Sequence, residues 1–128
     1  MNILLIEPDW VLADTYGRAL IVEGHQVVPC ASAQAGIQAA DSHSPDLVIL
    51  ELQLIDHSGI EFLYEFRSYG EWQDIPVLIH SQVPPAEFAS NWQLLKTELG
   101  VHEYLYKPST NLERLLKSVG TAKATAAA

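Results

Sequence analysis

The sequence predicts an α/β protein, a three-layer doubly wound (βα)5 sandwich in which helices cover both faces of a five-stranded parallel sheet. Two observations predict this fold class. Short apolar runs alternate five times with longer amphipathic segments along the 128 residues. The runs are continuously apolar, as in residues 3–6 (ILLI) and 47–50 (LVIL), which is typical of strands buried on both faces. Short connections and right-handed crossovers then favour an open parallel sheet.

The first two units are expected within residues 1–43. Residues 3–6 form the first strand, and Asp9 caps a helix that ends at Gly24. Residues 26–30 (QVVPC) form the second strand. Its Pro29 indicates an edge position, because proline donates no hydrogen bond to a neighbouring strand. An alanine-rich second helix follows and ends near residue 43.

The third unit begins with the strongest strand signal, residues 47–50. Ser58 and Glu61 then form a capping box that opens the third helix. A fourth strand is expected over residues 75–79. Pro84 and Pro85 are expected to open a fourth helix that ends at Gly100, with four apolar residues at helical spacing: Phe88, Trp92, Leu95 and Leu99.

The last unit is a fifth strand over residues 102–106 and an amphipathic helix that ends before Gly120. Residues 1–120 are therefore expected to form one domain. Residues 121–128 (TAKATAAA) are of low complexity and are expected to be a flexible tail or linker.

Composition excludes several classes of function. The net charge of −9, with only seven Lys and Arg residues, argues against nucleic-acid binding, because phosphate contacts need clustered basic side chains. No apolar run approaches the roughly 20 residues that span a bilayer. The start of the chain is typical of a strand and not of a signal peptide, so we expect a cytoplasmic location. The single cysteine, Cys30, excludes an internal disulfide, and the five histidines show no paired spacing for zinc.

In open parallel sheets the functional site lies beyond the carboxyl ends of the strands, at the topological switch point. Residues with useful chemistry follow four of the predicted strands there: Glu7, Pro8, Asp9, Glu51, Ser81 and Lys107. Ser81 is not expected to be a hydrolase nucleophile, because His80 would point to the opposite face of the strand.

An ordered set of motifs resembles the response-regulator receiver domains of bacterial two-component signalling, the family of the chemotaxis protein CheY. The set runs through nearly the whole chain: Pro45-Asp46-Leu47-Val48-Ile49-Leu50-Glu51, Ser58-Gly59, Ile75-Pro76-Val77, Ser81, Tyr104 and Lys107-Pro108. The resemblance implies the flavodoxin-like strand order 2-1-3-4-5. It also implies that residue 51 is the phosphoacceptor position, that Ser81 and Lys107 contact the phosphoryl group, and that Tyr104 is the switch aromatic.

The chain departs from the family pattern at the site itself. Glu51 stands where the family has aspartate, which moves the carboxylate out by one methylene, and misplacement of about 1 Å can cost roughly 10²-fold in rate. Pro8 replaces one of the two acids that hold Mg²⁺ in the family, and Glu7 takes the other position. Asp9 is a partial replacement at best, since its plainer role is helix capping. We therefore expect weak or absent Mg²⁺ binding, no cofactor and no enzymatic activity.

The leading interpretation is a phosphorylation-independent signalling module that binds a protein partner or itself. The face of the fourth helix, fifth strand and fifth helix is the candidate surface for this binding. The alternative is a true receiver phosphorylated on Glu51 or on a neighbour such as Asp56, with relaxed Mg²⁺ dependence. A flavin site is disfavoured, because the acidic residues 7–9 would repel a phosphate. The residues leave two roles open for Glu51: imitation of the phosphorylated state through Lys107, or simple charge pairing with that lysine.

Overall fold

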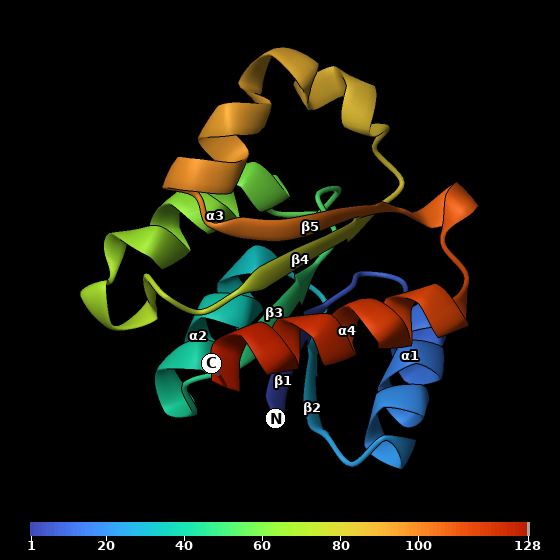
Figure 1. The fold of residues 1–128 in the computed structure, drawn as a ribbon. Coiled ribbons are helices and arrows are strands. Elements are labelled where there is room, and N and C mark those ends of the chain that lie inside the picture. Colours follow the sequence, from blue (N-terminus) through green and yellow to red (C-terminus); the bar gives the residue numbers. More distant parts are fainter. Residues whose placement is uncertain (128) are drawn as a thin grey trace.

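The fold is a five-stranded parallel sheet between two layers of helices (Figure 1). This computed structural model describes the backbone of residues 1–127 and the side chains of residues 1–123, and Ala128 lies outside the described residues. The strands are β1 (Asn2–Ile6), β2 (Gln26–Cys30), β3 (Leu47–Leu50), β4 (Val77–Ser81) and β5 (Val101–Tyr106). Their order, β2-β1-β3-β4-β5, confirms the predicted topology and places β2, with its proline, at an edge.

Four α-helices and several short helical turns complete the fold of residues 1–127. The α-helices are α1 (Trp10–Val22), α2 (Ala33–Ser42), α3 (Gly59–Ser68) and α4 (Leu112–Ala127). The turns are η1 (Gly70–Trp72), η2 (Pro85–Asn91), η3 (Leu94–Glu98) and η4 (Lys107–Ser109). Helices α1 and α4 cover one face of the sheet, and α2 and α3 cover the other (Figure 1).

The continuous apolar strands supply both core layers. In β1, Ile3 and Leu5 pack toward α1 and α4, whereas Leu4 and Ile6 pack toward α2 and α3. All four residues of β3 are buried as well. The Trp72 side chain is only 2 % exposed and stacks on the Phe66 ring.

Polar side chains cap three of the helices, and the caps at Asp9 and Ser58 are the predicted ones. Asp9 accepts hydrogen bonds from the amides of the first turn of α1, Ser32 caps α2, and Ser58 accepts from the amide of Glu61 at the start of α3. Each cap satisfies an amide that has no partner within its own helix. The cap role of Asp9 engages its Oδ1 with the first turn of α1.

The prediction of a regular fourth α-helix is wrong in the type of helix. Instead of a regular α-helix, residues 85–98 form the 3-10 turn η2 and the π-helical turn η3. The two prolines and the Ser-Asn pair at 90–91 explain this, because prolines lack an amide donor and Ser and Asn compete for backbone hydrogen bonds. The buried face is nevertheless the predicted one, since Leu95 and Leu99 lie in the core.

The last helix does not end at Gly120 as expected. Helix α4 continues to Ala127, and the Ala122 side chain is fully buried beside β1 and α1 residues of the core. Alanine is the strongest helix former, so an alanine-rich segment readily extends a helix that already packs on the sheet. The predicted tail is thus helical over residues 121–127, and its final residue lies outside the described part of the chain.

Candidate functional site

Four predicted site residues meet at the carboxyl ends of the central strands. Glu7 follows β1, Glu51 follows β3, Ser81 ends β4 and Lys107 follows β5. Glu7, Glu51 and Ser81 are each buried, and the Lys107 side chain is only 7 % exposed. Parallel strands end at the same edge of a sheet, so residues up to 100 positions apart converge here.

Lys107 bridges two carboxylates in this cluster. Its Nζ lies 2.5 Å from Glu7 Oε1 and 2.7 Å from Glu51 Oε1. Buried ions need such pairing, because an unpaired buried charge costs several kcal/mol. The cluster therefore holds two negative groups and one positive group, with the lysine at its centre.

Glu51 is the most heavily bonded group of the cluster. Its Oε1 accepts from Lys107 and from the backbone amide of Gln82 at 3.1 Å. Its Oε2 accepts from the Ser81 hydroxyl and from the amides of Leu52 and Gln53, at 2.6 and 3.2 Å for the two amides. Five donors therefore converge on one carboxylate.

These contacts set the charge state of the pair. Burial would raise the pKa of Glu51, but hydrogen bonds from Lys107 and Ser81 outweigh it and hold the pKa below its ordinary value. Burial would lower the pKa of Lys107, and the two carboxylates reverse this and raise it. Both groups are therefore charged at neutral pH.

Comparison with known proteins identifies the fold and family. Residues 3–120 match the family model described as the response regulator receiver domain. The chain belongs to this family. It is 31% identical over 107 residues to the KDP operon transcriptional regulatory protein KdpE of Escherichia coli (strain K12), covering 84% of this chain and 44% of KdpE. It is 35% identical over 89 residues to KdpE of Mycobacterium tuberculosis, covering 70% of this chain and 36% of that protein.

Solved receiver structures share the fold. A CheY-like receiver from Methanospirillum hungatei superimposes with a TM-score of 0.85 at 20% identity, over 98% of this chain and 94% of that one. The non-phosphorylated HemR receiver domain of Leptospira biflexa gives 0.79 at 25% identity, over 94% and 92%. The chain spans less than half the length of the curated regulators it matches.

The residues of this receiver domain do not fit the Mg²⁺ ion that the family implies. Pro8 offers no side-chain oxygen. Glu7 already binds Lys107 through Oε1 and the amide of Asp9 through Oε2, and Asp9 caps α1. Hard cations need several free oxygen ligands. Among residues 1–123, no group of three or more His, Cys, Asp or Glu side chains is arranged to hold a metal.

Hydrogen bonds to Val83 connect Glu51 with Tyr104, the residue to which the family resemblance assigns the switch role. The Ser81 hydroxyl donates to Glu51 and accepts from the amide of Val83 at 3.0 Å. The carbonyl of Val83 accepts from the Tyr104 hydroxyl at 2.6 Å. Tyr104 is half-buried, and its ring lies beside the rings of Phe88 and Trp92. Burial raises the pKa of Tyr104 to about 12.

Backbone donors are the part of the site that the sequence does not reveal. Three of the five groups on Glu51 are backbone amides, which every residue type except proline supplies, so motif reasoning found only Ser81 and Lys107. Asp56, the alternative acceptor, is elsewhere: its carboxylate binds the amides of Ala33 and Gln34 at the start of α2. The His80 ring lies against that of Tyr16, on the α1 side of the sheet.

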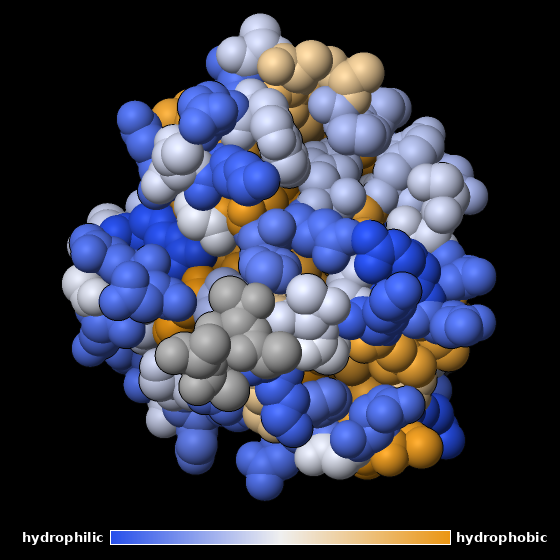
Figure 2. Space-filling model, viewed as in Figure 1, coloured by the Kyte–Doolittle hydropathy of each residue, from blue (hydrophilic) through white to orange (hydrophobic). Residues whose placement is uncertain are grey.

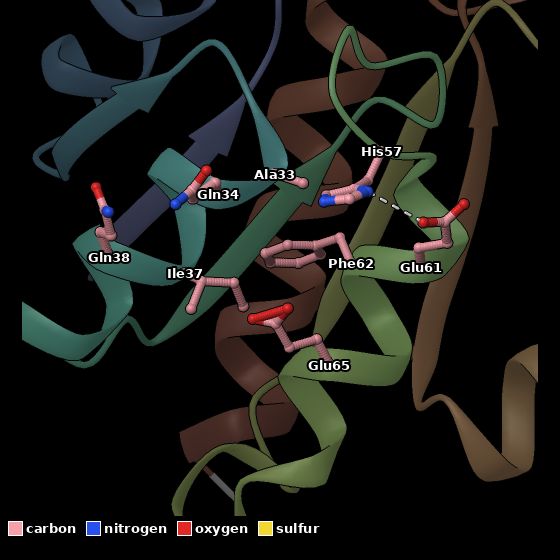
Figure 3. A pocket seen from close by; sticks show the side chains of 8 residues that line it. All are labelled: Ala33, Gln34, Ile37, Gln38, His57, Glu61, Phe62 and Glu65. Carbon is pink, nitrogen blue, oxygen red and sulfur yellow. Dashed lines mark ion pairs between the residues drawn. The ribbon is translucent and has the colours of Figure 1, made fainter.

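A pocket of about 500 Å³ between α2 and α3 contains none of the predicted site residues (Figure 3). The Phe62 ring lies between His57 and Glu65 in this view. His57 Nδ1 and Glu61 Oε2 lie 3.2 Å apart at its rim.

No described helix of the receiver domain is long and apolar enough to cross a membrane.

Proposed function

We propose that this receiver domain signals through protein contacts without being phosphorylated, and that the Glu51 carboxylate takes the place of the phosphoryl group. The observation that carries the proposal is the convergence of five donors on that carboxylate. Simple charge pairing needs only the lysine. Together with the lysine, a hydroxyl and three backbone amides form a binding site for an anion, and the Glu51 side chain itself occupies that site.

The length of the side chain supports this role. The family resemblance assigns Ser81 and Lys107 to the transferred phosphoryl group, and here both contact residue 51 directly. A glutamate carries its charge one methylene further from the backbone than an aspartate does. The negative charge therefore lies closer to where a phosphoryl group on aspartate would be.

The same contacts disfavour phosphorylation of Glu51. Attack on a phosphoryl donor needs a free oxygen in line with the donor. Both Glu51 oxygens are engaged, and Lys107 occupies the space between the two acids. Neither Glu7 nor Glu51 then has an oxygen left to hold a cation beside the phosphoryl donor.

The proposed surface for binding the partner is the face built from η2, η3, β5 and α4. The hydrogen-bond chain from Glu51 ends at Tyr104 on this face, where Phe88 and Trp92 flank a groove of about 400 Å³. Aromatic side chains are enriched at protein interfaces. The partner would be a cytoplasmic protein, in keeping with the location expected from the sequence.

Phosphate transfer tests the proposal. The chain is incubated with acetyl phosphate and Mg²⁺, and intact mass spectrometry follows the gain of one phosphoryl group. We expect none in the native chain and a gain in the double variant Pro8→Asp/Glu51→Asp, which restores the family's residues. Acid-labile phosphate on Glu51 or Asp56 of the native chain would overturn the proposal in favour of a true receiver.

A second variant separates imitation of the phosphorylated state from charge pairing. Glu51→Gln keeps the shape of the side chain but removes its charge. The new NH2 group is a hydrogen-bond donor, and it would face the donors that now bind the carboxylate. We expect the amide NMR signals of Val83 and Tyr104 to shift, whereas Glu65→Gln, an exposed control, leaves them in place. Shifts confined to residues beside Glu51 would leave charge pairing as its only role.

A further inference from the structure

The outer face of α1 carries exposed apolar residues at both ends of the helix, where a surface helix is usually polar. Trp10, Val11, Ile21 and Val22 are all exposed, Trp10 by 79 % and Val22 by 86 %. Figure 2 shows apolar atoms gathered over α1 at the lower right of the molecule. Single exposed apolar residues are ordinary, but several on the solvent side of one helix mark an interaction surface.

These side chains are symmetric about the middle of the helix. Counting outward from Tyr16, opposite charges stand two positions away on either side, at Asp14 and Arg18. Apolar pairs stand five and six positions away on either side: Trp10 and Val11 before, Ile21 and Val22 after. All six side chains of this α1 face are exposed. A two-fold interface needs such self-complementarity, because the same patch must fit itself.

We infer that the α1 face binds the α1 face of a second copy of this chain, with the two helices antiparallel and the two-fold axis near Tyr16. In that arrangement Trp10 lies against the partner's Val22, and Val11 against the partner's Ile21. Asp14 lies against the partner's Arg18, and the reverse pair forms across the axis. Within one chain Asp14 and Arg18 already pair at 2.8 Å, so four charges of alternating sign would meet at the axis. A parallel arrangement would place like charges opposite each other, so the charges favour antiparallel helices.

A groove beside α1 supports the pairing. It has a volume of about 340 Å³ and runs between α1 and the edge strand β2. Gly17, which has no side chain, leaves its floor open above Val27. Trp10 and Ile21 form part of its wall, so an apolar side chain of the second copy can be buried there.

The dimer is expected to be weak. Helix α1 has 13 residues and is therefore about 20 Å long, at 1.5 Å per residue. One helix pair of that length falls at or below the low end of specific interfaces, about 1,200 Å². We therefore expect the dimer to form only as the concentration of the chain is raised.

Charge reversal combined with mixing tests the pairing by sedimentation velocity over a concentration series. The native chain is expected to shift from its 14.2 kDa mass toward twice that value. Asp14→Arg and Arg18→Asp each place like charges across the axis, so each variant alone is expected to remain a monomer. Their equimolar mixture is expected to dimerise, because every contact then joins opposite charges. Asp14 and Arg18 are exposed, so neither change disturbs the core.

Three results would overturn the inference. A native chain that stays monomeric at every concentration removes the dimer. Single variants that dimerise as the native chain does place the dimer on another face, such as that of η2, β5 and α4. A mixture that stays monomeric beside a dimeric native chain excludes the antiparallel arrangement.

Discussion

Removal of the Lys107 charge should destabilise the protein strongly. Lys107→Met keeps the aliphatic stem but leaves Glu7 and Glu51 without their shared cation, and the Lys107, Glu7 and Glu51 side chains are only 3–7 % exposed. Removing one partner of a buried ion pair costs about 3–5 kcal/mol, because the other charge remains buried and unpaired. Native domains are stable by only about 5–15 kcal/mol, so this is a large fraction of the total.

The loss should depend on pH. In the native chain the pKa of Glu51 is held below its ordinary value, so its stabilisation is present above the unfolded pKa and is lost as pH falls through the folded one. In the variant, burial remains but the hydrogen bond from Lys107 is gone, so the pKa of Glu51 rises. Protonation then relieves the repulsion between Glu51 and Glu7, and the difference between variant and native chain shrinks on acidification.

Urea unfolding followed by circular dichroism measures both effects, at about pH 7.5 and about pH 5. Lys117→Met is the matched control, since Lys117 is an exposed helical lysine and should change stability by less than about 0.5 kcal/mol. A loss for Lys107→Met below about 1 kcal/mol, the value of a surface pair, would refute the reasoning. So would a loss of equal size at both pH values.

Three further predictions concern packing and burial. Gly59→Ala should cost about 1–3 kcal/mol, because a Cβ there would lie 2.7 Å from backbone, whereas Gly70→Ala, with open space around it, should be nearly neutral in the same urea assay. Trp72→Ala should cost about 3–5 kcal/mol in thermal or urea unfolding, and the exposed Tyr64→Ala much less; equal losses would contradict the burial of the indole. Burial, followed by the nearby lysine charge, lowers the pKa of His80 to about 4, so its ring signals in NMR should titrate there; a midpoint near 6.5 would contradict this.

The sequence predicts the sheet well because burial on both faces leaves a strong pattern. Residues 3–6 and 47–50 are apolar without interruption and are buried as expected. Pro29 correctly indicates the edge strand. Caps at Asp9, Ser32 and Ser58 are equally local, since each depends on one side chain and the next turn.

Tertiary context explains what the pattern does not reveal. Residues 85–98 have helical spacing, yet the type of helix depends on how prolines and polar residues share hydrogen bonds. The extension of α4 depends on the burial of Ala122 against distant residues. At the site, Ser81 and Lys107 were found from motifs, but the position of Lys107 between Glu7 and Glu51 depends on strand ends brought together by the fold.

The proposed role of Glu51 is that its carboxylate already occupies the phosphoryl position. The most direct test is a backbone amide NMR titration with Mg²⁺ and then beryllofluoride, a stable substitute for the phosphoryl group. We predict no saturable shifts in the native chain, and saturable shifts at residue 51, Ser81 and Lys107 that extend to Tyr104 in Pro8→Asp/Glu51→Asp. Saturable shifts of that pattern in the native chain would contradict the claim, because they require an open site.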